Sequence, residues 1–390
     1  MKMKKKTICF VSGSRADFGL MHNLIQKMLN NKKFKLVFIV TGMHLDNEFG
    51  YSYKEILKKG IKISKKIKTK FTIKQKGYIV NSLADTLKEF NNYFKKINPD
   101  LICIPADRHE MIAPAIAAFH LNLPIAHFFG GEITNGSKDD TIRHCLTKLS
   151  NIHFVSHKSH KRRVMQLGEN PKSVHLVGNM TIDNISKTIF FSKQKIEKKI
   201  NYKFSKKTIL VTYHPITTNP LSTEKELKNL LLALKDLVNV NILFTKPNND
   251  MGSDIVLKMI KNFVQKNKSR SKLYDSLGHS LYYSLVKQVD CVVGNSSSGL
   301  TEVPFLGTPS INIGIRQSGR TGLANIININ AKKSLIINGI KKVLSQKISN
   351  SNKKISQDLY FKKGATNKIE KILKKFLSKK IEKYPFYDYS

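Results

Sequence analysis

Acidic side chains occur in three motifs of the sequence, PADRHE at 105–110, HFFGGE at 127–132 and SKDDTIRH at 137–144. Each motif follows an expected strand or begins an expected helix, which places its carboxylates at the edge of a parallel sheet where ligands bind. Carboxylates that face one cleft can act as general acid and base once burial separates their pKa values. For Asp139 and Asp140, stabilisation of a helix N-terminus is the alternative. The candidates are Asp107, Glu132, Asp139 and Asp140.

The second half of the sequence supplies a histidine and a serine-rich turn. TYHPIT at 212–217 puts His214 at the end of an expected strand, where a structural and a functional role are equally open. GNSSSG at 294–299 joins another strand to an expected helix at 298–306. Its three hydroxyls and the N–H groups that begin the helix would suit a diphosphate, although serine-rich helix caps are common. The residues are Ser296, Ser297 and Ser298, with Glu302 one turn further on to accept hydrogen bonds from ribose.

Arginine is rare in this chain, so its positions are informative. The 68 Lys and Arg residues comprise 60 Lys and 8 Arg. A planar guanidinium forms paired hydrogen bonds with phosphate or carboxylate, which the lysine ammonium cannot do. Retention in a buried ion pair is the alternative for any single arginine. Five of them lie just after expected strands or near Gly-, Ser- or Asp-rich turns: Arg15, Arg108, Arg143, Arg316 and Arg320.

The first of these turns, VSGSRAD at 11–17, leads from the first expected strand into the first helix. Its backbone N–H groups, the positive helix end and Arg15 would suit an anion. It lacks the GxGxxG pattern of a dinucleotide site. We expect Asp17 to be the N-cap residue of the helix.

Composition narrows the class of protein. The formal charge is +41, but the lysines are spread along the chain without arginine forks or interleaved aromatic residues, so no specific nucleic-acid site is expected. No segment approaches the ~20 apolar residues of a membrane helix, and the apolar run at 7–11 is too short for a signal peptide. The four cysteines lack metal-site spacing, which argues against zinc and for a reducing cytoplasm.

Short β-branched apolar runs alternate with segments of helical periodicity, which is typical of parallel sheets with crossover helices. We expect one doubly wound α/β domain in residues 1–185 and a second in 205–350, separated by a Lys/Ser-rich linker with a ragged helix at 186–207. A lysine-rich amphipathic helical segment follows at 351–390, and its apolar positions, from Leu359 to Phe376, predict that it docks. The expected strands are 7–11, 35–40, 101–105, 125–128, 153–156, 175–177, 209–213, 241–244, 291–293 and 310–313.

Six motifs occur in order between residues 7 and about 324: GSRADFGL, PADRHEM, AHFFGGEITNGSKDDTIRH, TYHPIT, GNSSSGLTEVPFLGTP and INIGIRQSGR. With them the chain resembles the UDP-hydrolysing UDP-N-acetylglucosamine 2-epimerases, particularly the branch that feeds sialic and legionaminic acid synthesis. The resemblance implies a glycosyltransferase-B-like fold of two Rossmann-like domains, with a C-terminal helix that crosses back to the first. It also implies anti elimination of UDP from UDP-N-acetylglucosamine and hydration of the resulting 2-acetamidoglucal to N-acetylmannosamine.

The resemblance further implies roles for individual residues. No metal or cofactor is expected, the partner is a UDP-sugar, and a homodimer or homotetramer is expected. Those near the reacting sugar would be Asp107, Asp139 and His214, with Asp140 and Glu132 close by. Those that bind UDP would be Arg15, Arg108, Ser296, Ser297, Ser298, Glu302 and Arg316.

One position departs from the family pattern and leaves alternatives open. Phe129 stands where many relatives have Glu or His. If that side chain is an acid or base in the family, its function here falls to another carboxylate, or the sugar pocket differs. A phenylalanine there would accommodate a 4-acetamido-6-deoxy sugar, so the same chemistry on UDP-2,4-diacetamido-2,4,6-trideoxyglucose is an alternative. A glycosyltransferase of the same fold and a weakened sugar-nucleotide binder are the others.

Overall fold

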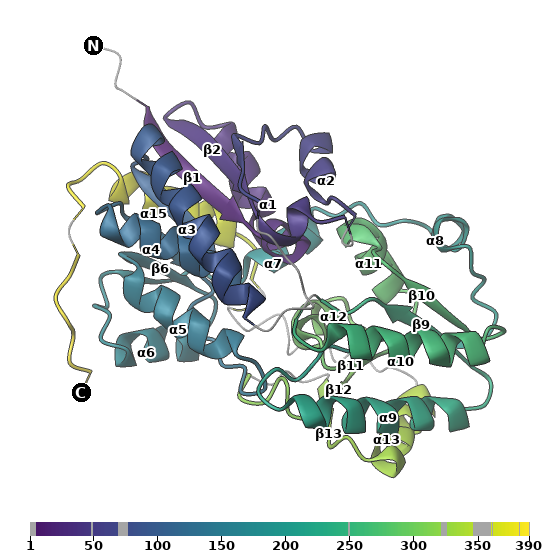
Figure 1. Cartoon of the computed structure of the whole chain (residues 1–390). Helices are drawn as coiled ribbons and strands as arrows, with labels where there is room; N and C mark the ends of the chain where they lie inside the picture. Colours follow the sequence, from purple (N-terminus) through teal and green to yellow (C-terminus); the bar gives the residue numbers. More distant parts are fainter. Residues whose placement is uncertain are drawn as a thin grey trace. The chain divides into compact units, whose positions relative to one another are not determined.

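A computed structural model describes residues 5–47, 50–68, 77–248, 250–320, 326–345, 360, 362–381 and 383–389 (Figure 1). The chain divides into two compact units. Unit 1 comprises Met1–Glu132, Asp139–Asn184 and Lys362–Ser390, and unit 2 comprises Ile133–Lys138 and Ile185–Phe361. In the part of the chain that the structure describes, no helix has the length and apolar character needed to cross a membrane.

Unit 1 contains a parallel sheet of seven strands in the order β3-β2-β1-β4-β5-β6-β7. Alternate residues of the strands point to opposite faces, so that Ile8 and Phe10 belong to one core and Cys9 and Val11 to another. Because both faces are covered, the central strands are apolar throughout. The strands are β1 Lys6–Ser12, β2 Phe34–Val40, β3 Lys65–Lys66, β4 Leu101–Pro105, β5 Ile125–Phe128, β6 Ile152–Val155 and β7 Val174–Leu176.

Helices of unit 1 cover both faces of this sheet. Helices α1 (Arg15–Leu29) and α15 (Ala365–Phe376) contribute to the core that contains Ile8, whereas α3 (Tyr78–Ile97) and α4 (Ile112–His120) contribute to the core that contains Cys9. The remaining elements are η1 Gly42–Leu45, α2 Tyr53–Lys58, η2 His109–Met111, α5 Asp139–Leu149, α6 Lys158–Gln166 and α7 Met180–Ser186.

The last helix of the chain belongs to unit 1, as the sequence predicted. In α15, Ile369 and Leu373 are fully buried and pack in the same core as residues of α1. Ile372 and Phe376 are partly buried against it. Leu359, another apolar position of the expected helical segment, lies outside the described residues. An amphipathic helix with this apolar face is stabilised by burial despite its many lysines.

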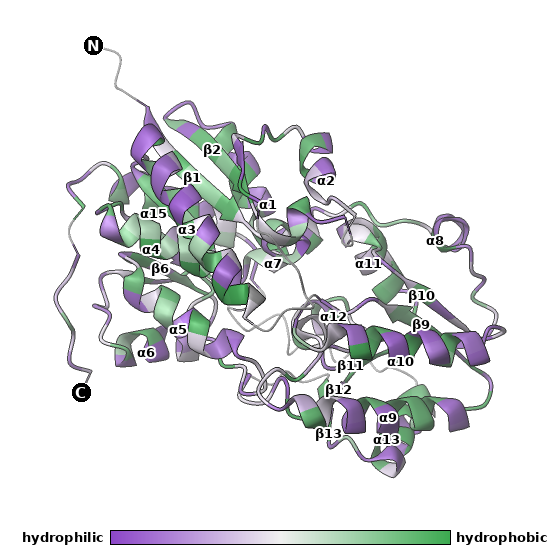
Figure 2. Ribbon diagram, in the orientation of Figure 1, coloured by the Kyte–Doolittle hydropathy of each residue, from purple (hydrophilic) through white to green (hydrophobic). Residues whose placement is uncertain are grey.

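Unit 2 contains a second parallel sheet, of six strands in the order β10-β9-β8-β11-β12-β13. Helices α9 (Pro220–Asp236) and α10 (Ser253–Lys266) contain both hydrophobic and hydrophilic residues, as expected for helices that bury one face against a sheet (Figure 2). The strands are β8 Lys207–Thr212, β9 Val240–Thr245, β10 Ser271–Tyr274, β11 Cys291–Gly294, β12 Ser310–Ile313 and β13 Ile326–Ile329. The helices are α8 Lys193–Ile200, α9 Pro220–Asp236, α10 Ser253–Lys266, α11 Gly278–Val286, η3 Ser297–Leu300, α12 Glu302–Phe305 and α13 Lys333–Ser345.

One predicted helix of unit 2 is wrong in its extent. The expected helix at 298–306 is a 3₁₀ turn, η3, followed by the single α-helical turn of α12. Pro304 explains the break, because it has no N–H to donate to the Leu300 carbonyl and its ring would clash with that carbonyl. The serine-rich turn therefore leads into a 3₁₀ turn, in place of the long helix whose first N–H groups were expected to suit a diphosphate.

Burial of α15 leads to a prediction about stability. Leu373→Ala removes a fully buried side chain from the unit 1 core and is expected to lower the free energy of unfolding by about 2–5 kcal/mol. Lys371→Ala, an exposed change in the same helix, is the control. Urea unfolding monitored by circular dichroism measures both, and equal midpoints would contradict the assignment of α15 to the core.

Candidate functional site

Both sheets have the strand order of a doubly wound nucleotide-binding fold. In such sheets the order reverses beside the first strand, here between β1 and β4 in unit 1 and between β8 and β11 in unit 2. Ligands bind beyond the carboxyl ends of the strands at these switch points. The segments that follow these four strands contain the predicted Arg15, Asp107, His214 and Ser296.

The predicted carboxylates of unit 1 gather around one arginine of α5. Arg143 is 1% exposed and donates to the Asp107 carboxylate, to Asp140 Oδ1 at 3.0 Å and to the Glu132 carbonyl oxygen at 2.8 Å. Burial alone lowers the pKa of Arg143, but the nearby Asp107, Glu132 and Asp140 outweigh it and raise the pKa. The guanidinium thus stays charged and fixes two carboxylates and the turn that carries a third. Asp139 begins α5 and is half-buried.

Two residues with left-handed backbone conformation lead from strand ends into the turns that carry Asp107 and Glu132. Ala106 has φ 52° and Phe129 has φ 66°, and each comes directly after a strand of the sheet. Such conformations cost about 1–3 kcal/mol each in non-glycine residues, and the surroundings must impose them. His127 does so for Ala106, because its Nε2 donates to the Ala106 carbonyl at 2.7 Å. The backbone N–H of Phe129 donates to the Phe154 carbonyl at 3.0 Å.

The Gly-Gly-Glu turn that follows β5 is held by α6. A Cβ at Gly131, whose φ is +76°, would overlap the His160 carbonyl, so only glycine fits. Arg163 Nη1 donates to the Gly131 carbonyl at 2.8 Å. The Phe129 side chain before this turn is 7% exposed and packs in the unit 1 core. The hypothesis that it accommodates a 6-deoxy sugar therefore finds no support in its surroundings.

The first turn of unit 1 corrects one prediction. Ser14, not Asp17, is the N-cap residue of α1, and its side chain accepts from the Asp17 N–H. The Asp17 carboxylate accepts from the Gly13 N–H at 3.1 Å, which resembles the reciprocal arrangement of a capping box. Arg15 pairs with Glu55 of α2 at 3.0 Å.

A buried acid cluster lies beside this turn. Arg108 is 6% exposed and pairs with Glu110 at 3.2 Å. Burial raises the pKa of Glu110, but Arg108 and His109 outweigh it and hold the pKa below its ordinary value. Asp17 is 2% exposed, and burial raises its pKa from 3.8 to about 7, with Arg108 opposing the shift. Arg108 thus forms the buried ion pair that was the alternative to ligand binding.

In unit 2, His214 is held at both its backbone and its ring. The Asn295 side chain accepts from the His214 N–H at 2.7 Å and donates to the His214 carbonyl at 2.8 Å. The N–H of Asn248 donates to His214 Nδ1 at 3.1 Å. Because Nδ1 accepts, the ring proton of the neutral imidazole lies on Nε2. His214 is 6% exposed.

The serine-rich turn after β11 is ordered by its own side chains. Ser296 caps η3, and Ser298 Oγ lies 2.8 Å from the Tyr282 hydroxyl. Glu302 accepts from the Thr301 hydroxyl, and burial raises its pKa against the effect of that hydrogen bond. Ser297 begins η3 and is half-buried.

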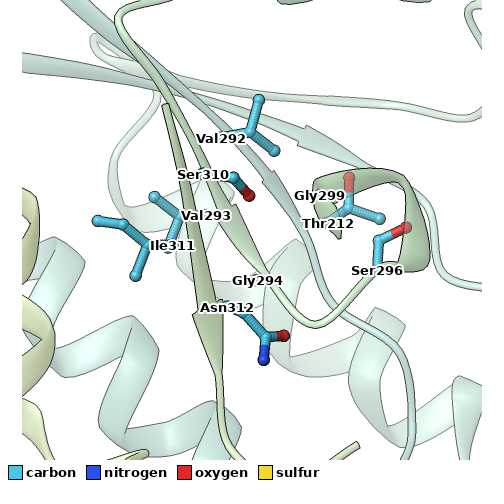
Figure 3. Close-up of a pocket in the computed structure, with 9 residues that line it drawn as sticks. All are labelled: Thr212, Val292, Val293, Gly294, Ser296, Gly299, Ser310, Ile311 and Asn312. Carbon is cyan, nitrogen blue, oxygen red and sulfur yellow. The ribbon is translucent and has the colours of Figure 1, made fainter. Parts of the chain in front are cut away.

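A small hollow lies beneath this turn at the ends of β8, β11 and β12 (Figure 3). About 210 Å³ of space between atoms lies there, part of it open to solvent. Of the predicted site residues only Ser296 lines it. Gly294, with φ +141°, is required there because a Cβ would overlap the Thr212 carbonyl. The lining residues are Thr212, Val292, Val293, Gly294, Ser296, Gly299, Ser310, Ile311 and Asn312.

Arg316 follows β12 and is 6% exposed. It donates from Nε to the Pro215 carbonyl at 3.0 Å and from Nη1 to the Asn295 carbonyl at 3.2 Å. Its Nη2 pairs with Asp250 at 3.3 Å. Like Arg108 and Arg143, it is retained in a buried ion pair. Each Nη carries a second N–H, so these contacts leave donors for a ligand.

The structure thus brings the predicted residues together in two groups, one in each unit. Asp107, Glu132 and Asp140 surround Arg143, whereas Arg15 and Arg108 belong to other ion pairs. The sequence indicated Arg143 only as one of five arginines suited to phosphate or carboxylate recognition, and it did not indicate Asn295, although both stand inside the motifs quoted above. Within the described ranges, no group of three or more His, Cys, Asp or Glu side chains could hold a metal ion.

The raised pKa of Asp17 predicts a pH dependence of stability. The folded protein holds this proton more tightly than the unfolded chain, so the stabilisation is complete below about pH 4 and is lost as the pH rises through 7. Asp17→Asn should remove a penalty on the order of 4 kcal/mol at pH 8, and much less at pH 4. Urea unfolding at several pH values measures this, with the exposed Asp85→Asn as control. Parallel curves for wild type and Asp17→Asn would contradict the burial of an ionisable Asp17.

Comparisons with known proteins agree with this architecture. Residues 26–374 match the family model described as UDP-N-acetylglucosamine 2-epimerase. The chain is 41% identical over 326 residues to the GDP/UDP-N,N'-diacetylbacillosamine 2-epimerase (hydrolyzing) of Campylobacter jejuni. This alignment covers 84% of this chain and 85% of the relative. It is 34% identical over 385 residues to the polysialic acid biosynthesis protein P7 of Escherichia coli, covering 98% and 97%.

A solved structure supports the predicted fold class. The crystal structure of UDP-GlcNAc 2-epimerase from Neisseria meningitidis bound to UDP-GlcNAc superposes with a TM-score of 0.78 at 16% identity, over 96% of this chain and all of that one. The two Rossmann-like units and the glycosyltransferase-B-like class are therefore confirmed. On the match of its family model and the identity to its relatives, this chain belongs to the UDP-N-acetylglucosamine 2-epimerase family.

Proposed function

We propose that this protein is a hydrolysing 2-epimerase that releases UDP from a UDP-linked 2-acetamido sugar and inverts C2 of that sugar. The single observation that carries the proposal is the group of carboxylates around the buried Arg143, in a chain of this family. It lies beyond the carboxyl ends of β4 and β5, where a sheet of this order binds ligands.

The chemistry requires a base at C2. That carbon bears the acetamido nitrogen and has no adjacent carbonyl carbon, so its proton is weakly acidic and needs a positioned acceptor. In the first step a carboxylate takes the C2 proton, a double bond forms between C1 and C2, and the C1–O bond breaks with its electron pair leaving on UDP. In the second step the oxygen of water bonds to C1 while that water gives one proton to a carboxylate, and an acid on the opposite face donates a proton to C2.

The acids of unit 1 suit these proton transfers. We propose Asp107, Asp139 and His214 at the reacting sugar, with Glu132 and Asp140 close by. Arg143 supports this assignment, because it holds Asp107 and Asp140 in fixed orientations. Carboxylates near C1 also stabilise the positive charge that develops there as the C1–O bond stretches.

The departing UDP needs its negative charge balanced. We propose that Arg316 and the hydroxyls of Ser296, Ser297 and Ser298 bind the diphosphate and that Glu302 binds the ribose. The free N–H groups of a rigidly held guanidinium suit phosphate oxygens. UDP contacts of Arg15 and Arg108 remain part of the proposal, as do the predicted homo-oligomer and cytoplasmic location.

For the sugar, two candidates are favoured by different observations. The Campylobacter relative is named for diacetylbacillosamine, which supports UDP-2,4-diacetamido-2,4,6-trideoxyglucose. UDP-N-acetylglucosamine is implied by the sequence resemblance and by the family description. We propose the diacetamido sugar as the preferred substrate, because that relative has 41% identity.

The test is to incubate the purified protein with each UDP-sugar and no acceptor, and to measure released UDP. Release with both, and higher kcat/KM for the diacetamido sugar, is expected. Higher kcat/KM for UDP-N-acetylglucosamine would overturn the substrate preference alone. UDP release only after an acceptor sugar is added would instead indicate a glycosyltransferase, and UDP binding without turnover a sugar-nucleotide binder.

Asp107 offers a prediction within this function. Asp107→Asn keeps the size of the side chain but cannot accept a proton, so kcat should fall by about 10²–10⁴-fold. The dissociation constant of UDP, measured by calorimetry, should change little. Asp85→Asn, on the exposed surface of α3, is the matched control. Unchanged kcat in Asp107→Asn would remove that residue from the site.

A further inference from the structure

We propose that Asn295 is a positioning residue that holds His214 in place for the reaction, an inference that rests on the proposed function. Asn295 follows β11 directly and is fully buried. Its side-chain amide bonds both backbone groups of one residue, His214, on the neighbouring strand end. The sequence alone indicates no role for this residue.

The Asn295 amide makes the hydrogen bonds that a further residue of strand β11 would make to His214. Strands β8 and β11 pair in register up to Thr212 and Gly294, and the Asn295 N–H adds one more bond to the Thr212 carbonyl at 3.1 Å. Beyond this point neither segment is a strand. The Asn295 side chain then supplies the acceptor for the His214 N–H and the donor for the His214 carbonyl that a further strand residue would provide.

Few other side chains can make this pair of bonds. The two contacts, 2.7 Å and 2.8 Å long, need one acceptor and one donor side by side. A carboxamide has both, a carboxylate accepts only, and a hydroxyl is too small to reach both groups. A buried backbone N–H or carbonyl left without its partner costs about 1–3 kcal/mol, so the segment that bears His214 would move to find one.

The ring of His214 is fixed by a second contact, with Asn248. The Asn248 N–H donates to Nδ1 at 3.1 Å, which leaves the proton on Nε2. This contact depends on where the His214 backbone lies. Asn295 therefore determines both the position of the imidazole and, through Asn248, which nitrogen carries the proton.

The backbone of Asn295 serves a different neighbour. Its carbonyl accepts from Arg316 Nη1 at 3.2 Å and from Gln317 Nε2 at 2.9 Å. Any residue at 295 retains this carbonyl. Arg316 also bonds to the Pro215 carbonyl beside His214, but it keeps its bonds to the Asn295 carbonyl and to Asp250. Substitution of the side chain should therefore disturb His214 more than Arg316 and lower kcat more than UDP affinity, and this split separates positioning from a general structural role.

The experiment compares Asn295→Asp and Asn295→Ala with wild type. The Asp variant keeps the size but loses the donor, and the Ala variant loses both bonds without adding charge, so that at least one is expected to fold. A displacement of about 1 Å at a reacting group costs about 10²-fold, and kcat should fall to that degree. The dissociation constant of UDP should stay within about threefold, whereas Arg316→Lys should weaken UDP binding because its fork is lost.

The matched control is Asn229→Asp. Asn229 lies in α9 of the same unit, and its amide donates to the Ala331 carbonyl at 2.8 Å. The substitution therefore removes the same kind of bond at a place that touches neither His214 nor Arg316. Its kcat should equal that of wild type.

Nitrogen NMR of protein labelled in histidine gives a readout that needs no turnover. The His214 signals, assigned by their loss in His214→Gln, should show the Nε2–H tautomer in wild type and a mixture in the Asn295 variants. If the wild-type protein turns over neither UDP-sugar, the proposed function fails. The comparison of the His214 tautomer between wild type and the Asn295 variants then tests the positioning role by itself. An unchanged His214 spectrum, or a loss of kcat no greater than in Asn229→Asp, would overturn the inference.

Discussion

A buried guanidinium must have its charge balanced nearby, and in unit 1 this constraint organises the acids. Arg143 is 1% exposed and reaches Asp107, Asp140 and the Glu132 carbonyl. Without its two carboxylate partners the guanidinium would be an uncompensated buried charge, which costs about 3–5 kcal/mol. The same pairing that satisfies the arginine thus prevents the carboxylates from turning into solvent, and so keeps several acids together at the ends of β4 and β5.

Unit 2 meets a similar requirement with neutral groups. Where β8 and β11 end, backbone donors and acceptors must still be satisfied, and the Asn295 amide does this for His214. The carbonyl of the same residue accepts from the buried Arg316. In both units the side chains proposed for function are therefore held by bonds that the fold needs for its own stability, which leaves them little freedom to reorient.

The sequence predicted the central strands well but missed three edge strands, β3, β10 and β13, whereas the edge strand β7 was predicted one residue from its position. The runs at 101–105 and 125–128 match β4 and β5 residue for residue, because strands buried on both faces are apolar throughout. Edge strands lack that signal: β3 is Lys65–Lys66, and the residues of β13 are exposed or half-buried. Pro304 did carry a signal for the break between η3 and α12, which our prediction of a single helix at 298–306 did not use.

The candidate site was predictable in its residue types but not in its contacts. Strand-end placement was enough to select Asp107, Glu132 and Asp140. It could not reveal that Arg143 pairs with Asp107, which is 36 residues away in the sequence. Nor could it reveal that Asn295 hydrogen-bonds to His214, which is 81 residues away. Nor could it place Phe129 in the core, because an apolar residue beside Gly-Gly suits a pocket wall and a core equally. Such contacts depend on which strands become neighbours, which no local pattern encodes.

Proton chemistry at C2, performed by acids that a buried arginine holds in place, is the central claim. Its most direct measurement is NMR of the sugar released by the wild-type protein in deuterated water. Essentially complete deuterium at C2 of a sugar with the manno configuration is predicted, since elimination removes the original proton and hydration returns one from solvent. A released sugar that keeps its protium at C2 and its gluco configuration would reduce the reaction to simple hydrolysis and contradict the account.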